Sequence, residues 1–510
     1  MMSRSPMLAA LVAFGATTAL IAQDRPLPSV PQSLGLQEAI DLANQFSPIY
    51  RQTQNNRGPA AWGVRNALAS TFLPSFTASG GVGYSGTGSQ NFLTQSFVQP
   101  SGTIGSSYSL TLGFQLSGQT LSQPGLARAQ LSATDAEITG ARMNLRSALV
   151  NQYLSVLQAQ DNVRLTEAQQ KRADEALRLA QARYQVGQTT VLDVRQAEVL
   201  KGRADVGLIQ AQQAVTVEKL RLFQQMGVAA PDDPSVVSLP DTFPVVEPTW
   251  ELQDLLAEAE EQNPDLNSLK ARHNAAVWNE RSAKSAWLPT FSFSARWSGY
   301  TQRFTDLNPV INNALVGAQQ DAEATAEQCQ YVNANLLNPG GTALPCPSTT
   351  LTAADTALIE QGLRARYPTV SVLDFGSYTR QPFSASIGVS FPIFTQFSRP
   401  LQASVAGAQA DDARELVRAR SLQVRTDVSQ AHYGLQTAYR TIAIQETNRA
   451  AAQEQLRLAT EQYRVGSATF LNVLDAQAVA QQAEADYVRA VYDYHRAIVL
   501  LETAVGRPLR

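Results

Sequence analysis

Histidine and cysteine, the side chains that most often bind metals or act as nucleophiles, are scarce in this chain. Its 510 residues include three histidines and two cysteines, namely His273, His432, His495, Cys329 and Cys346. No two of them have the spacing of a metal site, and no Ser-His-Asp, phosphate-loop or paired-carboxylate arrangement stands out. We therefore expect no cofactor, no bound metal and no enzyme activity, and we interpret the three histidines as packing or surface residues.

Two short polar motifs with equal spacing are the clearest candidates for a local function. Thr190 is followed three residues later by Asp193, and Thr469 is followed three residues later by Asn472. One interpretation is helix capping, in which short polar side chains satisfy free amides at a helix start. Asp475 lies one turn further along and is harder to explain as a cap, so a functional charge is the better interpretation there.

The charge balance argues against a nucleic-acid-binding protein. Lys and Arg number 40 against 43 Asp and Glu, charged residues make up 16% of the chain, and the formal net charge is −3. A protein that binds nucleic acid needs a concentrated basic surface to neutralise phosphates. We therefore expect no nucleic-acid partner.

The polar motifs belong to an internal duplication, which is the strongest signal along the chain. Residues 177–197 and 456–476 are offset by 279 positions and are identical at eleven of twenty-one positions. Upstream, Leu-Pro-Ser-Phe at 73–76 matches Leu-Pro-Thr-Phe at 288–291. The predicted organisation is two structural repeats and a proline-rich linker between them, at 34–227, 250–506 and 228–249 respectively.

Each repeat has the same predicted order of elements. A helix of about forty residues ends at the Leu-Pro step, because proline disfavours the helical conformation of its predecessor. Two strands follow, and then a helix of about sixty residues, which would be about 90 Å long at 1.5 Å per residue. These long helices are expected at 126–185 and 401–464. Each turns at a Val-Gly pair, where glycine suits the left-handed conformation that closes a helix, and returns as a helix of about forty residues.

The second return helix carries a heptad pattern of apolar residues. These are spaced alternately four and three apart, as Tyr487, Val491, Tyr494, Ile498, Leu501 and Val505. Such a seam indicates coiled-coil packing between helices. The corresponding seam of the first repeat is less apolar, because Gln212 and Lys219 occupy two of its positions.

Four predicted strands alternate small polar with apolar residues. They lie at 75–85, 107–116, 290–300 and 383–394. A two-residue period with one apolar face suits a wall between lipid and water. In lipid a sheet must close so that every backbone group is paired, and four strands are too few to close. We therefore predict a β-barrel shared between subunits. A soluble sheet that caps a helical bundle is the alternative.

The amino terminus predicts export from the cytoplasm. Arg4 precedes an apolar run at 7–21, which has about the length of a signal-peptide core. Cleavage after Ala22 would make residues 1–22 the signal peptide, and cleavage after Ala19 is the alternative. A membrane anchor is less favoured, because roughly 20 apolar residues are needed to cross a bilayer. No later apolar stretch is long enough for a transmembrane helix.

The second repeat carries an insertion of about eighty residues, 301–382, between its two strands, and the strand order places it at the extracellular end of the barrel. Both cysteines lie in it. Because an exported chain meets an oxidising compartment, we expect a disulfide between Cys329 and Cys346. Two free thiols in a mobile loop are the alternative.

The duplicated motif Tyr-x-Val-Gly-x-x-Thr-x-Leu-(Asp/Asn)-Val, together with the paired Leu-Pro-(Ser/Thr)-Phe steps, resembles the TolC family of outer-membrane efflux channels. The similarity extends over nearly the whole mature chain. It implies a mainly helical protein with a small β part, in which three copies form one twelve-stranded barrel in the outer membrane and a helical tunnel in the periplasm. It also implies two partners, a periplasmic adaptor protein and an inner-membrane pump.

The resemblance assigns a gate to the turn of the second repeat. By motif position, Asn472 and Asp475 would narrow the periplasmic entrance, Tyr463 would act as a latch before the turn, and Asp193 takes the corresponding place in the first repeat. The family often has aspartate where this chain has Asn472, so a ring of these residues would carry less charge here.

The resemblance also implies that the two turns meet the adaptor protein. The expected contact residues are Val186, Gly187, Val465 and Gly466, with Arg183 nearby. The second repeat has glutamine at the position of Arg183, so this arginine has no symmetric counterpart.

The predicted function is therefore a passive exit duct of a tripartite efflux pump or a type I secretion system. A trimeric coiled-coil surface adhesin, or a structural envelope protein, is the alternative. An adhesin of that kind would have its strands at the extreme carboxyl terminus, whereas the strands predicted here lie mid-chain.

Overall fold

The computed structural model describes residues 30–92, 95–335, 341–367 and 378–509. The predicted signal peptide, 1–22, lies outside the described residues. The chain forms two compact units. The helical unit comprises the described parts of 1–64, 125–277 and 406–510, and the sheet unit comprises those of 65–124 and 278–405.

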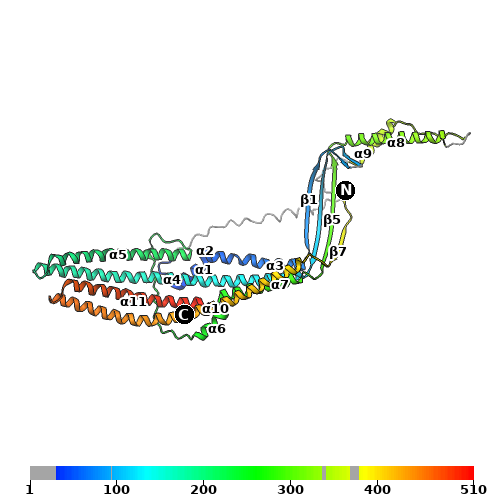
Figure 1. Cartoon of the computed structure of the whole chain (residues 1–510). Helices are drawn as coiled ribbons and strands as arrows, with labels where there is room; N and C mark the ends of the chain where they lie inside the picture. Colours follow the sequence, from blue (N-terminus) through cyan, green and yellow to red (C-terminus); the bar gives the residue numbers. More distant parts are fainter. Residues whose placement is uncertain (1–29, 93–94, 336–340, 368–377, 510) are drawn as a thin grey trace, which may run out of the picture. The chain divides into compact units, whose positions relative to one another are not determined.

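The elements of the first half follow the predicted order (Figure 1). Three short helices come first, then four strands, then a long helical hairpin: α1 Leu36–Phe46, α2 Pro48–Asn55, α3 Arg57–Phe72, β1 Ser75–Ser85, β2 Gly88–Phe92, β3 Gln95–Gln99, β4 Thr103–Leu116, α4 Gly118–Gln185 and α5 Val191–Met226. A single 3₁₀ turn, Pro234–Val236, lies in the linker.

The second half repeats this order with extra helices in the insertion. Its elements are α6 Leu252–Gln262, α7 Pro264–Ser285, β5 Thr290–Phe304, α8 Asn308–Asn335, α9 Ala353–Arg366, β6 Thr379–Arg380, β7 Ser384–Ser390, α10 Ser398–Arg464 and α11 Phe470–Val505. No helix in the described ranges has a stretch long and apolar enough to cross a membrane.

The first helix of each half is broken, so the prediction of one helix of about forty residues was wrong. Ser47 separates α1 from α2, and Asn263 separates α6 from α7. The residue after each break is proline, which cannot donate the next backbone hydrogen bond. At the second break the Asn263 side chain caps the start of α7, because its Oδ1 accepts from the amide of Leu266 (3.1 Å).

The long helices begin earlier than predicted, at Gly118 and Ser398, and Pro124 lies inside the first of them. A proline within a helix leaves the carbonyl four residues before it without its partner. Here the carbonyl of Thr120 accepts a hydrogen bond from the buried Thr71 hydroxyl instead (2.9 Å). This replacement explains how the helix continues through Pro124.

The Val-Gly turns are confirmed. Gly187 and Gly466 have φ angles of +74° and +87°, the left-handed region that favours glycine. The next amide in each turn donates back to a carbonyl in the last helical turn, from Gln188 to Arg183 and from Ser467 to Gln462, both at 2.9 Å. Each long helix therefore ends in a compact turn before its partner begins.

The heptad seam of α11 is confirmed as a packing surface. Its six predicted residues belong to one hydrophobic cluster with residues of α6 and α10. In α5 the corresponding seam contains Lys219, which is only 4% exposed. Its Nζ donates to the carbonyls of Pro234, Ser235 and Val237 (3.1, 3.4 and 2.7 Å), and burial lowers the pKa of the ammonium group. Carbonyl groups of the linker thus bind a buried cation at a position where the second half has an apolar residue.

The sheet unit contains an antiparallel sheet in which β1, β4, β5 and β7 pair in that order. The fourth strand, predicted at 383–394, is shorter in the structure, and the short β6 before it pairs with β5 beyond the end of β7. The second and third strands are longer than predicted, and β2 and β3 form a separate hairpin. Within the described residues, β1 and β7 each pair on one side only.

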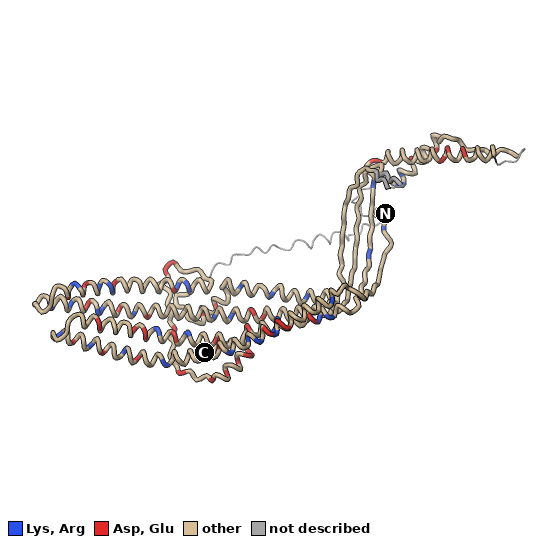
Figure 2. The backbone as a smooth tube through the Cα atoms, in the orientation of Figure 1, with Lys and Arg blue, Asp and Glu red and all other residues tan. Residues whose placement is uncertain are grey.

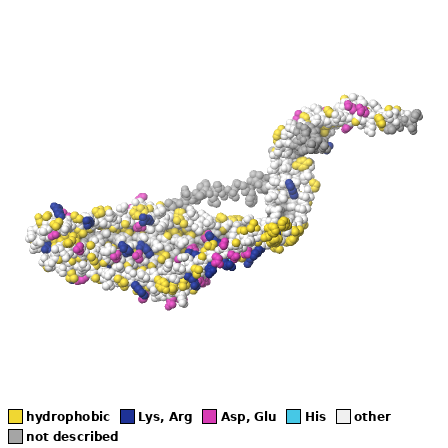
Figure 3. Space-filling view, viewed as in Figure 1, with side chains coloured by type: hydrophobic (Ala, Val, Ile, Leu, Met, Phe, Trp, Pro, Cys, Tyr) yellow, Lys and Arg dark blue, Asp and Glu magenta, His cyan; other side chains and the backbone are white. Residues whose placement is uncertain are grey.

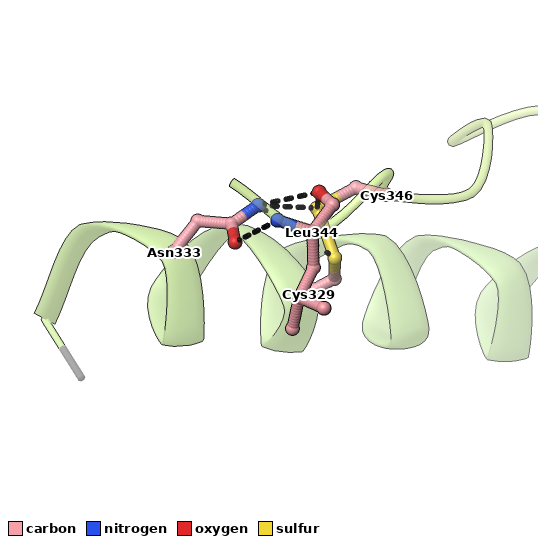
Figure 4. The surroundings of a disulfide bond; sticks show 4 residues. All are labelled: Cys329, Asn333, Leu344 and Cys346. Carbon is pink, nitrogen blue, oxygen red and sulfur yellow. Dashed lines mark hydrogen bonds between the residues drawn. A yellow bond between two sulfur atoms is a disulfide. The ribbon is translucent and has the colours of Figure 1, made fainter. Parts of the chain in front are cut away.

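The insertion contains two helices that the sequence analysis did not predict. Thr352 begins α9 with a capping box, because its hydroxyl accepts from the amide of Asp355 (3.2 Å) and the Asp355 carboxylate accepts from the amide of Thr352 (3.0 Å). After α8, the Cys329–Cys346 disulfide joins the helix to the following segment. Asn333 supports the same junction through two hydrogen bonds to the backbone of Leu344, both 2.9 Å (Figure 4).

The disulfide leads to a chemical prediction. Without reductant, neither Cys329 nor Cys346 is expected to react with an alkylating reagent in the folded protein, and reduction should expose both. Because the bridge closes a short loop, reduction should lower the local stability of the insertion by on the order of 3 kcal/mol. Mass spectrometry after alkylation reads the result, and labelling of both cysteines before reduction would contradict the bridge.

Candidate functional site

The candidate site is the pair of hairpin tips of the helical unit, where α4 turns into α5 and α10 turns into α11. The four helices run side by side in the order α5, α4, α11, α10 (Figure 1). At the apex of the turns, the side chains of Val186 and Val465 are 67% and 77% exposed. Residues placed in this way are available to another protein.

Two residues predicted to have separate roles meet at the tips. The guanidinium of Arg183, in the last turn of α4, lies 4.4 Å from the ring centroid of Tyr463, in the last turn of α10. Arg183 also donates a hydrogen bond to the carbonyl of Tyr463. The cation therefore contacts an aromatic face and one of the last carbonyls of α10, which also accepts from the amide of Gly466 (3.0 Å), at a helix end where the dipole favours positive charge. This contact links the two hairpins.

A small apolar cluster lies behind this link. Tyr463, which is 3% exposed, packs in it with Phe470 and with buried residues of both hairpins, namely Ala180, Val194, Ala197 and Val473. The Tyr463 hydroxyl is buried and has no hydrogen-bond partner among the described residues. An unpaired buried hydroxyl costs about 1–3 kcal/mol. The tip therefore contains both a favourable contact and an unfavourable one.

Beside the cluster, a cavity of about 500 Å³ opens between the ends of α4, α10 and α11. Its lining is mixed, with apolar Leu179 and Leu456 next to charged Glu175 and Arg457. Such a hollow between helices can accept side chains of a partner.

The polar motifs at the starts of α5 and α11 do not form simple caps. The side chains of Thr190 and Thr469 make no capping hydrogen bond to the helix backbone. Instead the Thr189 hydroxyl bonds to the Asp193 carboxylate, and the Thr469 hydroxyl bonds to the side-chain oxygen of Asn472. Capping alone therefore does not explain these positions.

Asp475 lies one turn beyond Asn472 on α11, and both side chains are exposed. Among the described residues Asp475 takes part in no ion pair or hydrogen bond. The carboxylate is therefore free to act on ions or on other chains by its charge.

Sequence analysis missed an ion pair that joins the hairpins further from the tips. Arg172 of α4 lies 3.0 Å from Glu484 of α11, which is 7% exposed and also accepts from Gln453 of α10 (3.3 Å). Arg172 lies far from the other two residues in the sequence, so the contact could not be predicted. The one sequence signal was Glu484 itself, a charged residue at a position where the heptad pattern of α11 would place an apolar one.

The sheet presents two chemically different faces. Residues directly opposite in antiparallel strands share a face, and the register places Thr77, Thr111, Arg296 and Ser384 on one of them. The other face is apolar, and its members include Phe76, Leu112, Ala295 and Ala385. Hydrophobic side chains also gather at one end of the sheet (Figure 3). There the exposed residues next to the strand ends are Phe391, Ile393 and Phe394.

The sequence profile of the family described as "Outer membrane efflux protein" matches residues 60–228 and 352–507, which is more than half of the chain. The chain belongs to the outer membrane efflux protein family. This efflux protein is an outer-membrane export channel with a helical part in the periplasm. The family assignment favours an export channel over an adhesin, and nothing in the described structure supports an adhesin.

Individual relatives agree with the family. The outer membrane efflux protein BepC of Brucella suis biovar 1 is 25% identical over 404 residues, which cover 78% of this chain and 72% of BepC. A membrane protein from Pseudomonas aeruginosa has a similar fold (TM-score 0.67, 19% identity, 94% and 91% of the two chains). VceC from Vibrio cholerae is comparable (TM-score 0.65, 18% identity, 93% and 97%). At these identities the structural likenesses establish the fold, and the TolC-like fold expected from the motifs is confirmed.

Proposed function

We propose that three copies of this efflux protein form one exit duct, which serves a tripartite efflux pump or a type I secretion system. The observation that carries the proposal is the sheet. It has one polar face and one apolar face, and in the described part of the chain its edge strands β1 and β7 each pair on one side only. A lipid-exposed edge leaves backbone groups without partners, so edges of neighbouring copies must pair to complete a barrel. Three copies would contribute twelve strands, as the resemblance implies.

The helical unit supports the same assembly. α5 lies at the margin of its four helices and buries one side against its own chain, through Leu222, Phe223 and Met226. Its other side exposes apolar residues at a seven-residue spacing, Leu192, Val199 and Val206, which are 60%, 55% and 54% exposed. A heptad-spaced apolar stripe is typical of a helix that packs against another helix. In the proposed trimer this stripe contacts the next copy.

The assembly is tested by native mass spectrometry and by conductance of the purified protein in a planar bilayer. We expect a mass of three chains in detergent and discrete channel openings in the bilayer. A stable water-soluble monomer that forms no channels would overturn the proposal.

We further propose that the hairpin tips gate this duct and bind a periplasmic adaptor protein, which links them to an inner-membrane pump. The Arg183–Tyr463 contact stabilises the closed tips, and the burial of the Tyr463 hydroxyl destabilises them. The closed and the open tips therefore differ by a small free energy. The exposed Val186 and Val465 at the apex are the proposed adaptor contacts, with Gly187 and Gly466 shaping the turns.

The gate proposal gives a prediction for Asp475. In the proposed gate, three Asp475 side chains narrow the entrance together with the neutral Asn472, and their carboxylates attract cations and repel anions there. Asp475→Ala shortens these side chains and so widens the entrance, and it is expected to raise single-channel conductance, or leakage of large antibiotics, about twofold to fivefold. The control is Asp486→Ala, since Asp486 lies on the same helix in a surface ion pair with Arg489 (3.4 Å). Unchanged conductance of a correctly assembled Asp475→Ala trimer would count against the gate.

A further inference from the structure

Arg296 is a charged residue on the polar face of the sheet, near the middle of β5. It lies directly opposite Thr111 of β4 and Ser384 of β7. Opposite residues in antiparallel strands share a face, so the three side chains lie on the same side. The polar face around it consists of small residues, among them Ser79, Ser107, Ser109, Ser294 and Ser298.

The charge of Arg296 has no counterpart on that face of the described strands. Strands β1, β4 and β7 contain no charged residue, while β5 and β6 contain three arginines and no carboxylate. Of these arginines, Arg303 lies opposite Ile104 and Arg380 lies opposite Gly299, which puts both on the apolar face. Figure 2 shows the same contrast, with charges frequent along the helices and rare along the strands.

The Arg296 side chain is exposed, and no carboxylate of the described residues neutralises its charge. Among the described residues Arg296 forms no ion pair. It lines an open hollow of about 430 Å³ over the sheet, together with Ser79, Ser107, Ser298 and Tyr300. Gly81 lies on this face and adds no side chain to the hollow, whereas Gly80 and Gly299 share the opposite face with Tyr108. A solute that passes along this face therefore meets one long cationic side chain among short hydroxyls.

We propose that Arg296 makes the outer section of the duct prefer anionic solutes, so that the cargo best suited to this exit carries negative charge. The inference rests on the proposed function, in which the polar face lines a water-filled bore and three copies bring three such arginines to one level. Unbalanced charge in a channel with low-dielectric walls raises the local concentration of ions of opposite sign. Anions would therefore accumulate at this level and cations would be depleted.

The test measures reversal potentials of single channels in a planar bilayer that separates two KCl concentrations. At about 0.1 M salt the Debye length is about 10 Å, so the charge acts on ions within about that distance of Arg296. Arg296→Glu is expected to raise the permeability of K⁺ relative to Cl⁻ by about twofold to threefold, and Arg296→Gln by less. At about 1 M salt, where the Debye length is about 3 Å, the difference should vanish.

Two variants serve as matched controls. Arg296→Lys keeps the charge and should leave the permeability ratio unchanged, and Arg303→Gln removes a charge from the same strand on the opposite face and should also leave it unchanged. Native mass spectrometry checks assembly, and if Arg296→Glu does not assemble, Arg296→Gln carries the test. Each variant is measured in the natural and in the Asp475→Ala background, so that charge at the other end of the duct does not mask the effect.

The outcomes separate this inference from the function on which it rests. If the purified protein opens no channels, the proposed duct is wrong. If channels open, but Arg296→Glu and Arg296→Gln leave the permeability ratio at about 0.1 M salt unchanged in both backgrounds, the role of Arg296 is wrong and the duct stands. An equal change on Arg303→Gln would also overturn the role, because the effect would then not depend on the polar face.

Discussion

Replacing Gly227 with alanine is expected to destabilise the purified protein far more than the same change at Gly187. Both glycines have a left-handed backbone, with φ angles of +76° and +74°. A Cβ at Gly227 would lie 2.4 Å from the carbonyl oxygen of Phe46, whereas a Cβ at Gly187 would have no atom within 4 Å. The conformational cost of alanine, about 1 kcal/mol, is common to both positions. The collision with backbone is specific to Gly227 and brings its total to on the order of 3 kcal/mol or more.

The structural reason is that the end of α5 packs directly against the break between α1 and α2, where Gly227 leaves no room for a side chain. Gly506 does the same at the end of α11, where a Cβ would lie 2.9 Å from the Cα of Asn263. Gly506→Ala should therefore resemble Gly227→Ala. The unfolding temperature of each variant is measured in detergent by circular dichroism. Equal shifts for Gly227→Ala and Gly187→Ala would mean that the helix end can move away from the break, contrary to this packing.

Removing the Arg183 side chain is expected to open the hairpin tips. Arg183→Ala loses the contact with the Tyr463 ring and the hydrogen bond to the Tyr463 carbonyl. Together these are worth about 2 kcal/mol, which corresponds to an increase of about 30-fold in the ratio of open to closed tips. Since the Tyr463 hydroxyl is buried with no partner among the described residues, its release to water favours opening further. Single-channel recording should show longer open times, and cells should become more sensitive to large antibiotics.

Two further variants make the tip experiment specific. Arg178→Ala removes an arginine from the same helix, but Arg178 is an exposed residue paired with Asp174 (2.8 Å), and such pairs contribute at most about 1 kcal/mol. It should leave gating nearly unchanged. Arg183→Lys keeps the charge without the planar group that stacks on the ring, so an intermediate effect is expected. If Arg178→Ala opened the channel as much as Arg183→Ala, the general loss of positive charge would be the cause, not the contact with Tyr463.

Features with a local cause could be predicted from the sequence. The Val-Gly turns were predicted because glycine at Gly187 and Gly466 suits the left-handed end of a helix, whatever surrounds it. The strands were predicted because their two-residue period persists along their length. The breaks before Pro48 and Pro264 also had a local signal, but apolar residues continue on both sides of each break, and the pattern therefore resembled one helix.

Features that join distant residues could not be predicted. Arg183 and Tyr463 are 280 residues apart, and their contact depends on how the two hairpins pack. The motif suggested separate roles for them, as an adaptor contact and as a latch. The helices of the insertion were missed for another reason, since α8 buries only Ile311 and Ala326 among its residues and α9 buries none. Without a strongly apolar side, such helices leave little periodic signal.

The many serines and glycines on the polar face of the sheet have a consequence for the size of the cargo. Apart from Arg296 and a few residues such as Gln302 and Tyr300, this face carries side chains that end within two heavy atoms of the backbone. In the proposed barrel, these short side chains leave the bore wide and form no pocket that would select a molecule by its shape. The outer section of the duct then cannot work as a sieve, and any limit on molecular dimensions has to be imposed among the helices.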